Sequence, residues 1–194
     1  MNEKEKMLNG FLYSPDKDKE LFADRLKAKT LCHKYNHLEP RNIEERKNII
    51  KQLLSKYSGE FWIEQPFECD YGYNIELGNN FYANHNLIIL DCAKVKFGDN
   101  VFIGPNCGIY TASHPLDFHK RNQGLEYALP VIIGNNVWIG GSVSILAGVT
   151  IGNNTVIGAG SVVTKNIPEN VVAAGNPCRI IKNIDKNIID KYKL

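Results

Sequence analysis

Residues 133–163 read IGNNVWIGGSVSILAGVTIGNNTVIGAGSVV and contain the most regular repeat of the sequence. A branched aliphatic residue recurs at every sixth position, at Ile133, Ile139, Ile145, Ile151, Ile157 and Val163. A second, mostly apolar set follows four positions after each of them, at Val137, Val143, Val149, Thr155, Ser161 and Ile167. An α-helix of about 3.6 residues per turn cannot keep such a set on one face. Short strands joined by tight turns can, which predicts a coil in which each hexapeptide forms one side of a triangular prism.

The residues between these aliphatic positions suit the corners of such a coil. Glycine follows the aliphatic residue at Gly134, Gly140, Gly152 and Gly158. Glycine and asparagine tolerate the positive φ that sharp turns need. The same phase continues upstream at Phe97, Ile103 and Ile109. A further run is displaced by two residues and contains Leu77, Ala83, Ile89 and Val95. We therefore expect a small insertion near Val95, and a chance run of Ile-Gly pairs in an ordinary β protein would not hold this phase.

The segments outside the repeats differ in kind. Helical spacing over 20–26 and over 43–57 predicts a helical cap at 1–58, covering the open N-terminal end of the coil. The β-helix domain is expected over 59–182. Its phase breaks after Ser113, because the next positions in step are poor interior residues, and this predicts an extruded loop over 114–130. The tail at 183–194 is predicted to form a short basic helix.

Composition excludes several classes of protein. The 194 residues are 43% hydrophobic and carry a net charge of +2, which gives no reason to expect nucleic acid or membrane binding. The sequence has no apolar stretch of transmembrane length, and its charged N-terminus lacks the apolar run of a signal peptide, so a cytoplasmic location is expected. The five cysteines are scattered without CxxC spacing, which favours neither a zinc ribbon nor a disulfide framework.

His114 is the residue best suited to catalysis. It lies in the segment YTASHPLD (110–117), where the coil gives way to the predicted loop. Loops on a rigid scaffold often carry function. Histidine titrates near neutrality and suits proton abstraction from an alcohol. The alternative is a surface histidine in a turn before Pro115.

The chain from about residue 6 to 182 resembles the maltose and galactoside O-acetyltransferases of the hexapeptide-repeat superfamily. The matching segments are GFLY (10–13), CDYGYNI (69–75), FYAN (81–84), YTASHPLD (110–117), NVWIG (136–140) and VAAGNPCR (172–179). The resemblance implies a left-handed parallel β-helix, a sense of winding that periodicity alone leaves open. It also implies a homotrimer with sites at subunit interfaces, and direct acetyl transfer from acetyl-coenzyme A to a sugar hydroxyl without a metal. The histidine that matches His114 is the general base in this family.

The resemblance also implies residues that bind the acceptor. These are Asp16, Asp70 and Asn84, whose polar groups suit sugar hydroxyls. Turn caps at the aspartates and a corner role for Asn84 are the alternatives. Glu126 is expected to orient His114 or to contact substrate, unless it is a solvated loop carboxylate. In the galactoside enzymes a second acceptor-binding aspartate follows the position of Asp91, whereas this sequence has a cysteine there, which argues against a galactoside acceptor.

On the coenzyme side, the residues that match family positions are Trp138, Gly141, Ala159, Thr164, Lys165, Arg179 and Lys182. Small residues let the pantetheine arm lie against the coil, and cations suit the phosphates. Lys182 stands where relatives have arginine, so the charge is kept and the bidentate fork is lost. Because Gly141 replaces a serine found in relatives, a backbone N–H of Gly141 or Ser142 is expected to hold the oxyanion. Trp138 lines the site or packs between subunits.

Three other readings remain open from the sequence. His114 and His119 are five residues apart with His85 upstream, a pattern that γ-class carbonic anhydrases use to bind zinc. However, the distance from His85 to His114 is not a multiple of six. An acetyltransferase with another acceptor, such as an antibiotic, an amino-sugar or serine, would share the fold and the coenzyme site. A structural solenoid without enzymatic activity is the third.

Overall fold

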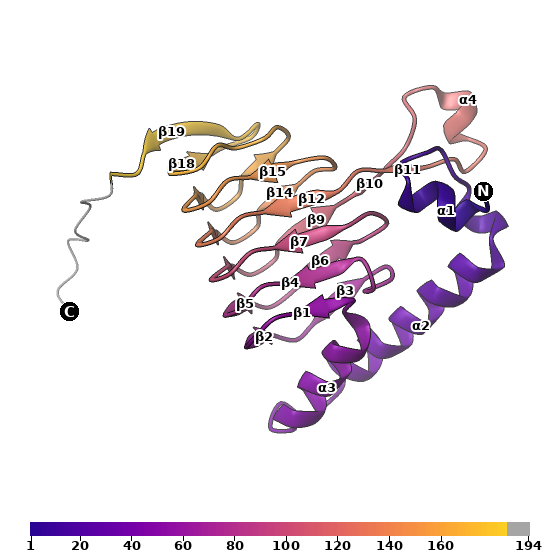
Figure 1. Ribbon diagram of the computed structural model, residues 1–194, viewed down its shortest axis with the longest axis horizontal. Helices are drawn as coiled ribbons and strands as arrows, with labels where there is room; N and C mark the ends of the chain where they lie inside the picture. The colour runs from indigo at the N-terminus through magenta and orange to yellow at the C-terminus, as the bar shows by residue number, and fades with distance from the viewer. Residues whose placement is uncertain (186–194) are drawn as a thin grey trace.

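Within residues 1–185, which the computed structural model describes, the repeats form three sheets around a common core (Figure 1). The first sheet contains β1 (Lys56–Tyr57), β4 (Ile75–Leu77), β7 (Val95–Phe97), β12 (Val131–Ile133) and β15 (Thr150–Ile151). The second contains β2 (Phe61–Ile63), β5 (Phe81–Ala83), β8 (Phe102–Ile103), β13 (Trp138–Ile139), β16 (Val156–Ile157), β18 (Val171–Ala174) and β19 (Arg179–Asn183). The third contains β3 (Phe67–Cys69), β6 (Leu87–Leu90), β9 (Gly108–Tyr110), β14 (Ser144–Ile145) and β17 (Val162–Val163).

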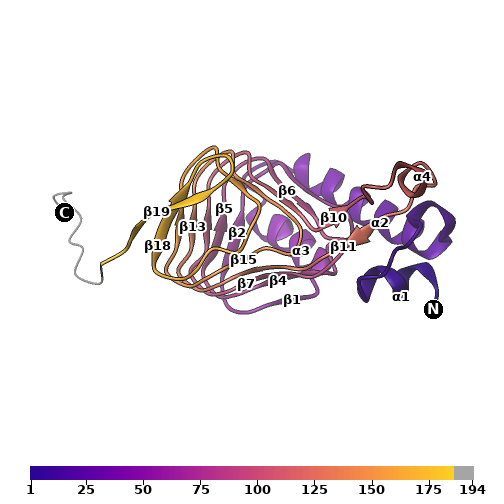
Figure 2. The same ribbon diagram turned by 90° about the horizontal axis from the view of Figure 1, so that it is seen from above.

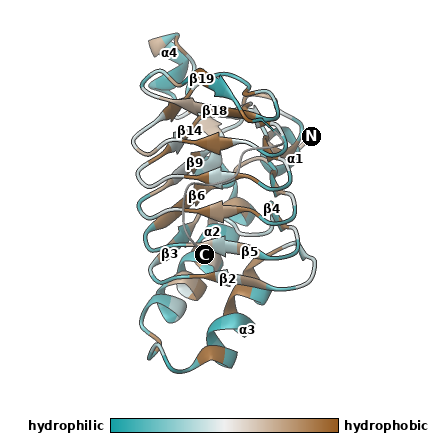
Figure 3. Cartoon of the chain, turned by 90° about the vertical axis from the view of Figure 1, so that its left-hand side faces the viewer, coloured by the Kyte–Doolittle hydropathy of each residue, from teal (hydrophilic) through white to brown (hydrophobic). Residues whose placement is uncertain are grey.

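The chain passes from the first sheet to the second and the third, and then begins the next coil. Strands of successive coils therefore lie above one another and pair in parallel (Figure 3). The pairing brings Ile133 beside Ile151 and Ile139 beside Ile157. The last strand, β19, pairs antiparallel with β18 at the C-terminal edge.

The inward positions predicted from the six-residue phase form the core. Each of Ile133, Ile139, Ile145, Ile151, Ile157 and Val163 is at most 1% exposed. The second set is buried as well, including the polar side chains of Thr155 and Ser161. Those two hydroxyls are satisfied by backbone carbonyls, because Thr155 donates to Pro168 O (3.0 Å) and Ser161 to Gly158 O (2.5 Å). The repeat therefore specifies a continuous apolar interior in which these two buried hydroxyls are hydrogen-bonded.

Asparagines line the corner between the first and second sheets. Positive φ occurs at Asn80, Asn100, Asn136, Asn154 and Asn170, a conformation that asparagine tolerates. Their side-chain amides donate along the coil axis, each to the oxygen of the asparagine in the next coil, over 2.8, 3.1, 2.9 and 3.0 Å. This ladder explains why asparagine, rather than glycine, stands at these corners.

Asn100→Ala is expected to destabilise the fold by about 1–3 kcal/mol, because alanine disfavours positive φ and makes neither ladder bond. Asn100→Gly is the matched control, since glycine adopts this φ freely and lacks only the bonds. We expect the alanine variant to unfold at the lowest temperature, the glycine variant next and the parent protein last. An alanine variant as stable as the parent would contradict the role given to the ladder.

Helices precede the coil, as the sequence predicts, and cover its N-terminal end and one side (Figure 1). They are α1 (Glu3–Leu8), the 3-10 turn η1 (Pro15–Lys17), α2 (Lys19–Asn36) and α3 (Ile43–Leu53). The helix expected over 43–57 ends at Leu53, because Leu54 is extended and Tyr57 already pairs with Leu77 in the first sheet. The short helix α1, capped by Asn2 and Glu5, was not predicted.

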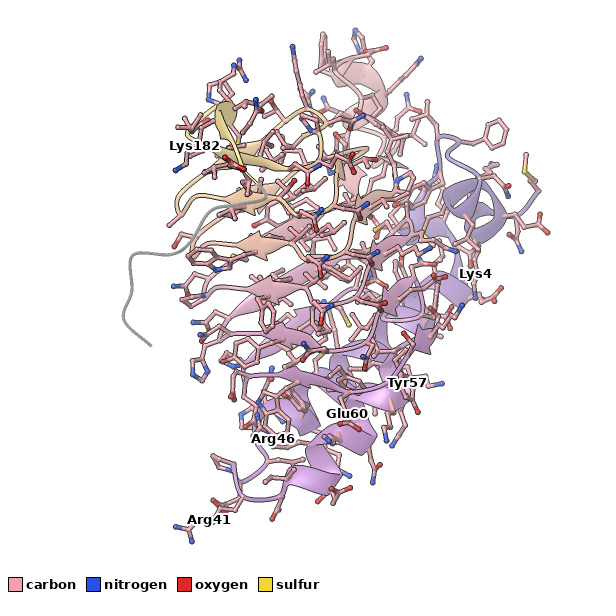
Figure 4. The ribbon with its side chains drawn as sticks, turned by 60° about the vertical axis from the view of Figure 1, so that its left-hand side comes forward. Lys4, Arg41, Arg46, Tyr57, Glu60 and Lys182 are labelled. Atoms are coloured by element: carbon pink, nitrogen blue, oxygen red, sulfur yellow. The ribbon has the colours of Figure 1, made fainter. Side chains whose placement is uncertain are left out.

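Arg46 fastens α3 to the first coil. Its guanidinium is buried, contacts Glu64 Oε2 at 3.2 Å and lies 4.6 Å from the ring centre of Trp62. It also donates to Pro40 O at 3.2 Å, at the turn between α2 and α3. Figure 4 shows Arg46 at the helical end of the molecule and Lys182 at the far end of the coil.

Departures from the repeat occur at the corner between the third and first sheets. Ile75 pairs with Val95, two positions more than the 18 that separate Ile133 from Ile151. The extra residues lie in 91–94, which confirms the insertion expected near Val95, and a similar wide corner at 70–74 lies one coil below. In the next coil the chain leaves this same corner altogether between β9 and β12. We call this the wide corner (70–74, 91–94 and 111–130).

The described part of the chain ends just after β19. Asn183 ends β19, and the greater part of the helix predicted over 183–194 lies outside the described residues. Among residues 1–185, no helix combines the length and apolar character needed to cross a membrane.

Candidate functional site

The loop predicted over 114–130 projects from the wide corner as a small hairpin. Its base is the antiparallel pair β10 (Ala112–Ser113) and β11 (Tyr127–Ala128), so it leaves the coil two residues earlier than predicted. Its tip contains α4 (Phe118–Arg121), whose N-terminus is capped by Asp117 accepting from His119 N at 2.9 Å. In Figures 1 and 2 the hairpin lies beside α1 and α2.

His114 follows β10 directly, on the outgoing arm of this hairpin. Its Nδ1 lies 3.2 Å from the carbonyl oxygen of Leu125. Since a carbonyl can only accept, this contact places the proton on Nδ1 and the lone pair on Nε2. Nε2 lies 3.9 Å from Glu126 Oε1, and half of the imidazole surface is exposed. The ring is thus held in the tautomer that a general base needs, with its basic nitrogen accessible.

Glu126 is held by the N-terminal segment. Its backbone exchanges two hydrogen bonds with Tyr13, of 3.0 and 2.9 Å, and its Oε2 accepts from the Tyr13 hydroxyl at 2.8 Å. Leu125 O therefore orients the imidazole, whereas the Glu126 carboxylate faces the basic nitrogen. The sequence leaves Glu126 as a residue that orients His114, one that contacts substrate, or a solvated loop carboxylate, and these contacts place its carboxylate beside the basic nitrogen.

Asp70 lies at the lower level of the wide corner. Burial raises the pKa of its carboxyl, and the positive charges of Arg25 and Lys29 oppose this shift. Cys92 Sγ donates to Asp70 Oδ2 over 3.6 Å. Burial also raises the pKa of the Cys92 thiol, which favours the neutral form. At the position where galactoside enzymes have an aspartate, this chain therefore presents an uncharged donor.

Asp91 shapes this corner from beneath. It is fully buried, and its carboxylate accepts from the backbone N–H groups of Tyr71 (2.8 Å), Asp70 (3.1 Å) and Asn74 (3.3 Å). Burial raises the pKa of Asp91 to about 6, although the backbone donors oppose the shift. Sequence reasoning did not assign this residue a role. The one sequence feature that points to Asp91 is its place within the insertion near Val95, where a regular coil needs no extra residue.

Asp16 borders the loop from the cap. Its carboxylate is largely exposed and lies 4.0 Å from Arg25 Nη2. A Cβ atom on Gly124 would lie 3.8 Å from Asp16 Oδ2, which places the carboxylate beside the hairpin. The structure thus brings His114, Glu126, Asp70 and Asp16 to the wide corner and the helices that cover it.

Asn84 lies elsewhere. With Tyr82, Phe102, Gly104 and Trp138 it lines a shallow groove on the outer face of the second sheet. Its side chain accepts from His85 N at 2.7 Å. In this position Asn84 accompanies the residues expected to contact the coenzyme rather than the other acceptor residues.

The remaining expected coenzyme residues are spread over the C-terminal coils. Gly141 and Ala159 occupy consecutive levels of the corner between the second and third sheets, as β13–β14 and β16–β17 flank them. Thr164 and Lys165 follow β17 at the next corner. Arg179 and Lys182 lie on β19, on the side of the coil away from the hairpin (Figures 1 and 2). One chain therefore separates the carboxylates of the wide corner from the expected coenzyme residues on β19.

The structure describes no metal site in residues 1–185, where no group of three or more His, Cys, Asp or Glu side chains is arranged to hold an ion. His85 lies at the corner between the second and third sheets, with Nδ1 2.6 Å from Gln65 O. His114 projects from the wide corner. The zinc alternative would require these two residues to meet, and in one chain they lie at different corners.

Family models of known proteins match three parts of this architecture. Residues 6–59 match the family model described as the maltose acetyltransferase hexapeptide capping motif. Residues 130–165 match the bacterial transferase hexapeptide model of six repeats, and residues 94–112 match the hexapeptide repeat of succinyl-transferase.

Individual proteins agree with these models. Galactoside O-acetyltransferase of Escherichia coli K12 is 50% identical over 161 residues, which cover 83% of this chain and 79% of that protein. The crystal structure of a maltose O-acetyltransferase from Clostridium difficile 630 aligns with a TM-score of 0.94 and 52% identity, covering 96% of this chain and 99% of that one. A galactoside acetyltransferase in complex with coenzyme A aligns with a TM-score of 0.94 and 45% identity, covering 100% and 98%.

Proposed function

Since the chain belongs to the maltose and galactoside O-acetyltransferase family, with the left-handed parallel β-helix of hexapeptide-repeat acetyltransferases, we propose that it transfers the acetyl group of acetyl-coenzyme A directly to a sugar hydroxyl. The observation that carries this proposal is the surroundings of His114. Its tautomer is set by the Leu125 carbonyl, and its exposed basic nitrogen faces the Glu126 carboxylate at 3.9 Å. Carboxylates suit the several hydroxyls of a sugar as hydrogen-bond acceptors.

In the proposed reaction, His114 Nε2 takes the proton of the acceptor hydroxyl as that oxygen attacks the thioester carbonyl. The C–S bond then breaks, and coenzyme A leaves as a thiol after receiving the proton. The Glu126 carboxylate, 3.9 Å from Nε2, stabilises the imidazolium formed in between. Rate comes from base catalysis and from the positioning of two bound substrates.

Direct transfer agrees with the state of the cysteines. All of them lie within residues 1–185, and each is a buried free thiol. Burial raises the pKa of Cys92 and of Cys107, which disfavours the thiolate needed for an acetyl-enzyme.

The backbone of Gly141 is the better of the two expected oxyanion donors. The Ser142 N–H already donates to Pro105 O at 2.7 Å. We therefore assign the oxyanion to the Gly141 N–H. Along the same corner, Ala159 leaves room for the pantetheine arm, with Trp138 and Asn84 on the adjoining face. Thr164, Lys165, Arg179 and Lys182 provide the polar and cationic contacts for the nucleotide end.

A complete site requires neighbouring subunits, and we propose a homotrimer. The hairpin and β19 lie on opposite sides of one coil, so His114 of one subunit would meet the coenzyme residues of another (Figure 2). The second sheet also presents a ladder of outward aromatic side chains, in which Trp62, Tyr82, Phe102 and Trp138 are neighbours in register. Phe102 is 42% and Trp138 58% exposed, a surface suited to burial between subunits.

The acceptor class is tested by assaying thiol release from acetyl-coenzyme A with a panel of acceptors. We expect the highest kcat/KM with glucose or maltose, and a lower value with a galactoside because Cys92 replaces the second aspartate. An amino-sugar, an aminoglycoside antibiotic and serine are the competing acceptors. A clear preference for any of these three would replace the sugar assignment, and no transfer to any acceptor would favour the structural solenoid.

A further inference from the structure

Tyr13 connects the N-terminal cap to the hairpin that carries the proposed base. It precedes η1 and is fully buried, in a cluster that includes Met7, Leu21, Tyr71 and Cys92. Its backbone forms an isolated antiparallel bridge with Glu126, which lies 113 residues away in the sequence. Together with the pairing of β10 and β11, this bridge fixes the position of the Glu126 backbone at the wide corner.

The Tyr13 hydroxyl makes a separate contact with a different purpose. It donates to Glu126 Oε2 at 2.8 Å, and the other carboxylate oxygen, Oε1, lies 3.9 Å from His114 Nε2. The two oxygens of one carboxylate are thus shared between a buried phenol and the imidazole. Without the phenol, the carboxylate could rotate about its side-chain bonds, since the backbone bridge does not restrain them.

We propose that Tyr13 is a positioning residue, whose hydroxyl holds the Glu126 carboxylate against the basic nitrogen of His114. This inference rests on the proposed function and adds to it a role for the N-terminal segment in the chemical step. A carboxylate fixed beside Nε2 stabilises the imidazolium without reorganising during the reaction, whereas a mobile one would have to be ordered each time.

The surroundings of Tyr13 suit a permanent donor. Burial raises the pKa of its phenol well above the ordinary value, and the neighbouring Cys92 and Glu126 act in the same direction. The phenol therefore stays protonated, and the carboxylate receives its hydrogen. Glu126 keeps about a fifth of its side-chain surface exposed, so the loss of this bond would leave the carboxylate solvated rather than orphaned.

Tyr13→Phe tests the hydroxyl, because it keeps the ring packing and the backbone bridge. We expect kcat to fall about 10-fold, the effect of losing a charge-assisted hydrogen bond that positions a catalytic group. The KM for acetyl-coenzyme A should not change, since the expected coenzyme residues lie on other corners. Partial unfolding alone would also lower the apparent kcat at an unchanged KM, so the rates are referred to the concentration of folded enzyme measured by circular dichroism.

A double-mutant cycle with Glu126→Gln tests whether Tyr13 acts through the carboxylate. We expect the double variant to be no slower than Glu126→Gln alone, because the hydroxyl then has no carboxylate to hold. Two single effects that multiply in the double variant would overturn the proposal, as would a Tyr13→Phe enzyme with the parent kcat.

Tyr35→Phe is the matched control. Tyr35 is equally buried in the cap, and its hydroxyl donates to Ile63 O, far from the hairpin in the fold. We expect this variant to lose stability but to keep its kcat. If Tyr13→Phe keeps the parent kcat while His114→Ala is inactive, the positioning role of Tyr13 is wrong and the proposed function still stands. If the parent protein transfers no acetyl group at all, the proposed function itself fails.

Discussion

His114→Ala is expected to lower kcat by about 10²–10⁴-fold, the usual contribution of a general base. The imidazole lies on the hairpin with half of its surface exposed, and the deep core does not depend on it. The variant should therefore fold, with an unchanged unfolding temperature. The KM for acetyl-coenzyme A should stay within a small factor of the parent value, because the alanine removes only the proton acceptor.

His119→Ala is the control for this experiment. His119 lies in the same hairpin, on α4, and the centre of its ring is 3.9 Å from the ring centre of Phe118. We expect normal turnover, because this imidazole has no place in the proposed reaction. Near-normal turnover by a well-folded His114→Ala enzyme would rule out the base assignment. Equal losses at both histidines, together with a stoichiometric metal, would support the zinc alternative.

Arg179→Ala is expected to raise the KM for acetyl-coenzyme A by roughly 10- to 100-fold, since a charge-assisted phosphate contact is worth about 1.5–3 kcal/mol. Arg179 begins β19, where its guanidinium donates to the Cys178 carbonyl at 2.9 Å. This contact leaves further N–H donors on the guanidinium for a phosphate. The KM for the sugar should barely change, because the acceptor residues lie at the wide corner.

The effect should shrink with a coenzyme analogue lacking the 3′-phosphate, if that group is the one contacted. Arg41→Ala is the matched control, because Arg41 is exposed at the helical end, far from Lys182 (Figure 4). A changed sugar KM with an unchanged coenzyme KM would reverse the orientation of the two substrates. If neither value changes, Arg179 is an ordinary surface residue.

The candidate site could be predicted only in part. The His114 segment stood out because it follows the last in-phase residue before the repeat breaks. Asp70 and Glu126 are expected to serve the same site. The structure places the Glu126 carboxylate 3.9 Å from His114 Nε2 and Asp70 lower on the same corner, and their functions stay predictions. Asn84 lines the groove of Trp138, near the corner between the second and third sheets, so in one chain it lies apart from the hairpin, and its expected contact with the acceptor stays a prediction. No role is predicted from the sequence for Tyr13 or Asp91, although Tyr13 ends the matching segment GFLY (10–13) and Asp91 begins the insertion near Val95.

The six-residue repeat is enough to predict the coil, its core and its corners. Each hexapeptide contributes one inward aliphatic residue and one turn, so the local structure follows directly from the repeat. Ile139 and Ile157, for example, pair in successive coils. Only the tertiary structure shows which of the irregular segments lie next to one another. The insertions at 70–74 and 91–94 and the hairpin share one corner because successive coils stack in register. The bond from Tyr13 to Glu126 spans 113 residues, and no local pattern encodes such a contact, because it forms only when the cap folds back onto the coil.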